Sequence, residues 1–150
     1  MSLFARWAPA AARLLLGLVF VVFGSNYFLN FLPSPPPMPE RALTFVGGLI
    51  AGGYVFPVIK SIEIAAGLML LSNRFVPLAL TLLAPIIVNI AAVHYLLAPA
   101  FALPTVILGL ELFLAYSYRG AFAPMLRANV APEPAAQHAR ELGAPALELR

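Results

Sequence analysis

The sequence predicts an all-α integral membrane protein, a four-helix bundle with a short outer-surface helix between the first and second long helices. Four apolar runs lead to this prediction, and they cover residues 8–31, 54–71, 75–96 and 101–118. Each has about the 20 residues that an α-helix needs to cross a hydrocarbon core of about 30 Å. The composition agrees, because 62% of the residues are hydrophobic and only 10% are charged. An ordinary soluble domain has about 25% charged residues.

The first run, residues 8–31, resembles a signal peptide because Arg6 and Arg13 precede most of it. It continues too long for one, however, and no good cleavage site follows Gly24, so we predict a retained first membrane helix. Gly17 and Gly24 are seven residues apart and share one helix face. Small residues of this kind let another helix, or a second copy of the chain, approach closely.

Two features separate the first and second runs. Five prolines between residues 33 and 39 predict an extended connector outside the membrane. Residues 40–51 then predict a helix that is too short to span, because Gly52 and Gly53 end it. A helix on or dipping into the outer membrane surface fits this segment best.

The remaining runs follow one another with short links. The tight link at residues 72–74 predicts an antiparallel hairpin of the second and third helices, and Pro85 should kink the third. Residues 1–127 form the membrane domain in this interpretation. Residues 128–150 are rich in Ala, Pro and Glu and predict a mostly disordered cytoplasmic tail, with a short peripheral helix as the alternative.

The distribution of basic residues predicts the orientation. With four spans, both termini and the middle link lie on one side of the membrane, and that side holds Arg6, Arg13, Arg74, Arg119 and Arg127. The other side holds only Arg41, beside Glu40. The positive-inside rule therefore places both termini in the cytoplasm. The basic residues stand singly, which argues against nucleic-acid binding.

Six polar side chains inside the spans are the candidate site. An ionisable group costs about 2.5–3.5 kcal/mol at the centre of a membrane helix, so each needs a reason. Counted at about 1.5 Å per residue, five of them lie about 8–15 Å below the outer boundary. Helical stripes on three of the helices could turn them toward one pocket. The six are Lys60, Glu63, Glu111, Asn89, Asn26 and, nearer the interface, His94.

The charges of this predicted pocket suggest roles. Lys60 and Glu63 are one turn apart and form the natural ion pair. Glu111 is then the odd carboxyl group, which could be protonated, bound to a cation, or paired with charged His94. Such a carboxyl group suits proton transfer or hydrogen bonding to a quinone. The alternative is that these residues, Asn26 and Asn89 above all, only fasten the helices together.

Several chemistries are excluded or weakened by the composition. The chain has no cysteine, so it cannot use its own thiols for disulfide exchange, metal ligation or an iron–sulfur cluster. It has two histidines, one of them in the tail, so a bis-histidine haem within the membrane is excluded and no metal site is predicted. No nucleotide-binding or hydrolase motif is present. The chain has no self-contained catalytic motif.

Taken in order, the motifs along residues 6–127 resemble the DoxX family of small four-helix bacterial membrane proteins. The segments that carry the resemblance are Arg13-Leu14-Leu15-Leu16-Gly17, Phe23-Gly24, Gly53-Tyr54, Phe56-Pro57, Glu63-Ile64-Ala65-Ala66-Gly67, Asn73-Arg74-Phe75-Val76-Pro77, Ala84-Pro85-Ile86-Ile87-Val88-Asn89 and Glu111-Leu112-Phe113-Leu114-Ala115-Tyr116. The resemblance implies a protein of the bacterial inner membrane that is associated with quinone-linked oxidoreduction, at most as a subunit of a quinone-linked oxidoreductase.

Three hypotheses for the function follow. The first is a protein that binds an isoprenoid quinone or similar lipid in the polar pocket and serves a redox partner subunit. The second is a subunit that transports a small solute or protons, and the third is a membrane scaffold without a ligand. Four short helices bury little volume, so association with itself or with another subunit is also expected.

Overall fold

The computed structural model describes residues 3–33 and 37–129, and this part of the chain is helical without a β-strand. The prediction of an all-α fold is therefore confirmed. The helices are α1 (Leu3–Leu29), α2 (Glu40–Ala51), α3 (Val55–Ser72), α4 (Val76–Leu96), α5 (Ala102–Ser117), α6 (Arg119–Phe122) and the 3₁₀ helix η1 (Ala123–Leu126). A short helix is present over residues 40–51, while its place at the outer membrane surface stays a prediction. The predicted tail falls almost entirely outside the described residues.

Three helices of the described chain are long and apolar enough to cross a membrane, namely α1, α3 and α4. The fourth predicted span, α5, has 16 residues. At about 1.5 Å per residue it is about 24 Å long, shorter than a typical hydrocarbon core of about 30 Å. It makes a fourth candidate span only together with the segment Arg119–Leu126, from which it is bent by 74°.

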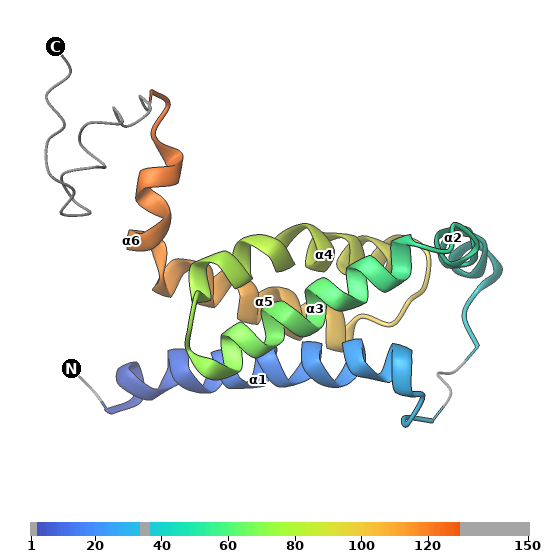
Figure 1. Cartoon of the computed structure of the whole chain (residues 1–150), viewed down its shortest axis with the longest axis horizontal. Helices are drawn as coiled ribbons and strands as arrows, with labels where there is room; N and C mark the ends of the chain where they lie inside the picture. The colour runs from blue at the N-terminus through green and yellow to red at the C-terminus, as the bar shows by residue number, and fades with distance from the viewer. Residues whose placement is uncertain (1–2, 34–36, 130–150) are drawn as a thin grey trace, which may run out of the picture.

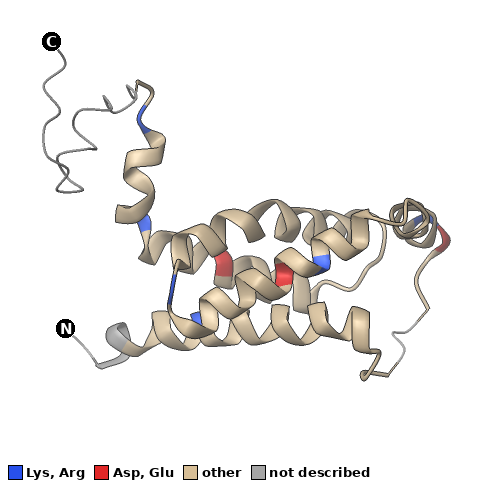
Figure 2. Ribbon diagram, viewed as in Figure 1, with Lys and Arg blue, Asp and Glu red and all other residues tan. Residues whose placement is uncertain are grey.

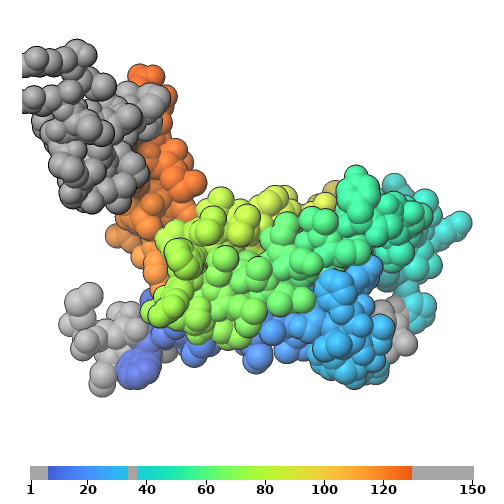
Figure 3. Space-filling model, viewed as in Figure 1, coloured from blue at the N-terminus to red at the C-terminus, as the bar shows by residue number. Residues whose placement is uncertain are grey.

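The four long helices form a closed ring. Helix α1 packs against α3 and α5, α3 packs against α4, and α4 packs against α5. In Figure 1 the start of α1 and the end of α5 lie at the same end of this bundle. Helix α2 lies at the opposite end, where it is seen almost along its axis and so crosses the direction of the bundle. It contacts α3 there, as the space-filling view also shows (Figure 3).

The closest helix pair, α1 and α3, meets at two glycines. A Cβ atom at Gly17 would lie 2.9 Å from the carbonyl oxygen of Gly67, and a Cβ atom at Gly67 would lie 2.9 Å from that of Gly17. Two backbones can approach this closely only without side chains between them. Gly24 also faces α3, where its Cβ would lie 2.8 Å from Ile64 Cγ1. The face of Gly17 and Gly24 is therefore occupied by α3 and is not open to a second copy.

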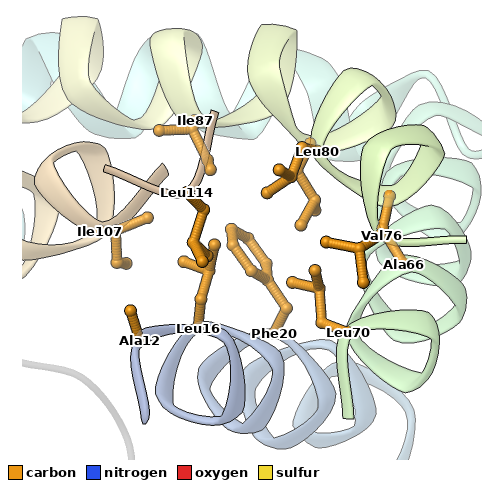
Figure 4. Close-up of a cluster of buried hydrophobic side chains, with 12 residues drawn as sticks. Ala12, Leu16, Phe20, Ala66, Leu70, Val76, Leu80, Ile87, Ile107 and Leu114 are labelled. Atoms are coloured by element: carbon orange, nitrogen blue, oxygen red, sulfur yellow. The ribbon is translucent and has the colours of Figure 1, made fainter. Parts of the chain in front are cut away.

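The centre of the bundle is filled by aliphatic side chains and one ring. Figure 4 shows Phe20 of α1 among residues from α3, α4 and α5, with Leu16 and Leu114 beside it. All of these side chains are buried. Charged residues are few along the described helices (Figure 2). The core is therefore mainly apolar. Glu63 and Glu111 are two charged residues that are nevertheless buried within the bundle.

The hairpin of α3 and α4 is held by an unexpected partner from α1. Asn73 adopts a left-handed conformation, φ 57°, and its N–H donates to Leu70 O at 3.2 Å. The guanidinium of Arg13, only 8% exposed, donates to the same carbonyl and more weakly to Leu71 O at 3.4 Å. A cation suits the negative end of the α3 dipole. Arg13 therefore caps the carboxyl end of α3.

Candidate functional site

The centre of the candidate site is an ion pair between Lys60 and Glu63 on α3. Lys60 Nζ donates to both carboxylate oxygens, at 3.0 Å to Oε1 and 2.8 Å to Oε2. The side chain of Glu63 is 2% exposed and that of Lys60 is 19% exposed. The two residues are three positions apart and so lie on one helix face. Burial of a lone carboxylate is costly, and Lys60 offsets that cost for Glu63.

Neighbouring elements fix the position of this ion pair. Helix α1 lies directly behind it, because Gly24 leaves only 3.4 Å between a Cβ at its position and the Cβ of Glu63. The ring of Phe56, one turn earlier on α3, lies 6.0 Å from Lys60 Nζ. Phe56 in turn contacts Tyr27 of α1, with 5.8 Å between the ring centroids. These contacts hold the pair against α1.

A first cavity of about 310 Å³ opens beside the pair, between α2, α3 and α4; we name it the α2 cavity. Four polar residues line it, namely Lys60, Glu63, Asn89 and His94. The rest of the lining is apolar apart from backbone atoms, and consists of Phe45, Val46, Leu49, Phe56, Ile59, Pro85, Ile86, Ile90 and Val93. Apolar walls with a few polar groups are typical of small-molecule sites.

A second cavity of about 620 Å³ lies on the other side, between α1, α3, α4 and the start of α5; we name it the α5 cavity. It shares Lys60, Glu63, Ile90 and His94 with the α2 cavity. All of its other lining residues are apolar: Val19, Phe20, Phe23, Ala100, Phe101, Ala102, Leu103, Pro104 and Ile107. The ion pair and His94 therefore form a polar boundary between the two cavities.

Two further residues add hydrogen-bonding groups: His94 on this boundary, and Asn89 in the α2 cavity alone. His94 Nδ1 lies 2.7 Å from Ile90 O. A carbonyl oxygen only accepts, so Nδ1 carries the hydrogen, and in the neutral imidazole Nε2 remains an acceptor. The side chain of Asn89 is exposed and makes no hydrogen bond within the described part of the chain. Its amide is thus available to a ligand in the α2 cavity.

Asn26 and Glu111 do not line either cavity. Asn26 Oδ1 accepts a hydrogen bond of 2.7 Å from the backbone N–H of Leu32 and closes the turn after α1. Glu111 lies on the inward face of α5 and is 6% exposed, and its Oε2 has no hydrogen-bond partner among the described residues. The structure therefore brings together four of the six candidates: Lys60, Glu63, Asn89 and His94.

The sequence analysis did not assign Phe45, Val46 and Leu49 of α2 to the site. Positions i, i+1 and i+4 share one face of a helix, and this apolar face is the available signal. This face indicates that α2 packs against another part of the molecule, but it does not indicate against which helices. The sequence analysis also did not assign the residues at the start of α5 to the site. They line a cavity only because α5 packs between α1 and α4, which is a contact between helices.

The boundary offers a defined set of chemical groups. Lys60 has three N–H bonds and spends two on Glu63, so one remains for a ligand. Asn89 supplies further donors and His94 an acceptor, while the ion pair carries no net charge. These groups suit an uncharged head that accepts and donates hydrogen bonds. In residues 3–33 and 37–129 no group of three or more His, Cys, Asp or Glu side chains could hold a metal ion.

Comparisons of the chain with protein-family models, with curated proteins and with solved structures found no match. The site must therefore be interpreted from its own geometry.

Proposed function

We propose that this chain is a small membrane protein that binds a lipid-soluble ligand, with an isoprenoid quinone as the leading candidate, beside Lys60 and Glu63. The observation that carries the proposal is an ion pair with a buried carboxylate, which borders two apolar-walled cavities. Each cavity falls within the range of about 300–1,000 Å³ seen for ligand sites. A pair that served only to fasten helices would need no such space around it.

The hydrogen-bonding groups support a quinone among lipid-soluble molecules. A quinone carbonyl accepts hydrogen bonds, and the third N–H of Lys60 and the amide of Asn89 are donors near the same cavity. A quinol hydroxyl donates, and His94 Nε2 is an acceptor in the neutral imidazole. The same groups can therefore bind both redox forms of the ligand.

The electrons must come from elsewhere, because no redox group of the chain itself is apparent from its sequence. We propose a role as quinone-binding or anchoring subunit beside a redox partner, in line with the resemblance to the DoxX family. The membrane would be the bacterial inner membrane, with both termini in the cytoplasm. In this orientation the ion pair lies in the outer half of the bilayer.

The proposal is tested by the lipids that co-purify with the protein. Wild type is compared with the double variant Lys60→Met/Glu63→Gln, which removes both charges together and leaves none unpaired. Thr81→Val is the matched control, since Thr81 is an exposed polar residue of α4 that lines neither cavity. Bound quinone is extracted from each protein and quantified by mass spectrometry.

We expect quinone with wild type and Thr81→Val, and at least about tenfold less with the double variant, a loss equivalent to about 1.4 kcal/mol of binding free energy. Equal quinone in all three proteins, or none in wild type, would overturn the proposal. If a different lipid shows the same pattern, the site is supported and that lipid is its ligand. If no specific lipid co-purifies with any of the three proteins, the hypothesis of a membrane scaffold without a ligand is favoured.

A further inference from the structure

We infer that the two cavities are two halves of one site, in which the α2 cavity holds the polar head of a single-tailed lipid and the α5 cavity holds its tail. This inference rests on the proposed function and adds to it the direction in which the ligand lies. It also narrows the ligand class to molecules with one compact polar head and one long apolar chain.

The first observation behind the inference is the unequal chemistry of the two cavities. Apart from the shared residues, the α2 cavity contains the polar side chain of Asn89, which has no partner within the described chain. The α5 cavity adds nine residues, and none of them has a polar side chain. A head that forms hydrogen bonds gains binding free energy in the α2 cavity. An apolar chain gains binding free energy by burial in the α5 cavity.

The second observation is that the cavities meet at the same side chains. Lys60, Glu63, Ile90 and His94 line both, so a molecule bound beside them borders both cavities. The unequal sizes agree with this division, because the smaller volume, about 310 Å³, is the one with the additional polar group. The larger volume, about 620 Å³, is the apolar one.

The third observation is that part of the apolar cavity is lined by side chains that are packed against other residues. Phe20 and Ile107 line it and are buried in the core. Its outer rim is held by Tyr95, whose ring stacks on Phe101 with 5.6 Å between centroids and whose hydroxyl bonds Thr105 at 2.5 Å. A chain that enters a cavity formed in advance loses less of its binding energy to ordering the protein.

The test uses two benzoquinones that share one head group and differ in tail length, one with a single isoprene unit and one with four. Kd values are measured by native mass spectrometry for four proteins. Ala102→Trp fills the α5 cavity from the first turn of α5, and Ala92→Trp is its control, an exposed alanine of α4 that lines neither cavity. Asn89→Leu removes the polar group that belongs to the α2 cavity alone.

We expect Ala102→Trp to raise Kd for the long-tailed quinone by at least about tenfold, the loss that follows when about two methylene groups are no longer buried. The same variant should leave Kd for the short-tailed quinone within about twofold, and Ala92→Trp should change neither. Asn89→Leu should raise both Kd values by a similar factor. This pattern supports a separate tail half.

Two other results of this experiment would overturn the inference but would not contradict the proposed function. One is an unchanged Kd for the long-tailed quinone in Ala102→Trp, and the other is equal weakening of both quinones by that variant. If neither quinone binds wild type, the proposed function itself fails.

A measurement on wild type alone guards against a variant that folds poorly. A quinone with a photoreactive diazirine at the end of its tail is bound, irradiated and located by peptide mass spectrometry. Attachment within residues 100–107 or to Val19, Phe20 or Phe23 supports the inference. Attachment to Phe45, Val46 or Leu49 would place the tail in the α2 cavity and overturn it.

Discussion

Lys60 and Glu63 form an ion pair on α3 in which each charge compensates the other. Glu63 is 2% exposed and has both carboxylate oxygens bonded to Lys60. When one partner of such a pair is removed, the other remains as an uncompensated charge. The pair is therefore a structural requirement as well as a candidate binding group, and variants must separate the two roles.

Glu63→Gln should lower the free energy of unfolding by about 3 kcal/mol, because it leaves the ammonium of Lys60 without its carboxylate. The double variant Lys60→Met/Glu63→Gln should recover part of that loss. The measurement is denaturant unfolding in one detergent, with the exposed Glu40→Gln as control, which should change stability by less than about 1 kcal/mol. Wild-type stability in Glu63→Gln would mean that Lys60 does not depend on this carboxylate.

Glu111 differs from Glu63 because its buried Oε2 has no partner among the described residues. An unpaired buried polar group costs about 1–3 kcal/mol, so Glu111→Met should raise the free energy of unfolding by that amount. Quinone retention should not change, since Glu111 lines neither cavity. The same unfolding and lipid assays measure both. If Glu111→Met lowers stability or loses the ligand, a group outside the described contacts binds this carboxyl.

Among the helices, the contact of α1 with α3 is the closest, and it depends on glycine. Gly17→Ala would place a Cβ 2.9 Å from the backbone oxygen of Gly67, which cannot move aside as a flexible side chain would. We expect a loss of about 1–3 kcal/mol in unfolding free energy, the range for an overpacked interior. The α1 face behind Glu63 would shift with it, so quinone retention should also fall.

Gly109→Ala is the matched control for this prediction. Gly109 also lies within a long helix, but a Cβ at its position meets nothing within 4 Å. The substitution should therefore be neutral or stabilise the helix by about 0.5–1 kcal/mol. Equal effects at Gly17 and Gly109 would show that the α1–α3 distance does not limit the fold.

For the whole molecule, the orientation in the membrane can be tested directly because the chain has no cysteine of its own. Single cysteines can be placed at two exposed positions, Ser72 at the end of α3 and Thr44 on α2. The end of α3 and helix α2 lie at opposite ends of the bundle (Figure 1). We expect a membrane-impermeant maleimide added to intact cells to label Thr44→Cys and not Ser72→Cys. After cell lysis both should react. The reverse pattern would place the termini outside.

The order and limits of the helices could be predicted from the sequence to within a few residues. The observed α3, Val55–Ser72, and α4, Val76–Leu96, each differ by one residue or less from the predicted runs. The reason is local, because apolar length, Pro, Gly and the left-handed Asn73 act on neighbouring residues. The Lys60–Glu63 pair was predictable for the same reason, since a spacing of three residues fixes it within one helix.

Contacts between helices could not be predicted in this way. Four apolar helices, a short fifth one and one ion pair could be predicted because each depends on residues close together in the chain. The packed structure was needed to learn that Gly17 faces α3, that Arg13 caps α3, and that Glu111 and Asn26 do not line the cavities. These outcomes depend on how each helix is rotated about its axis, and packing among all of the helices sets that rotation.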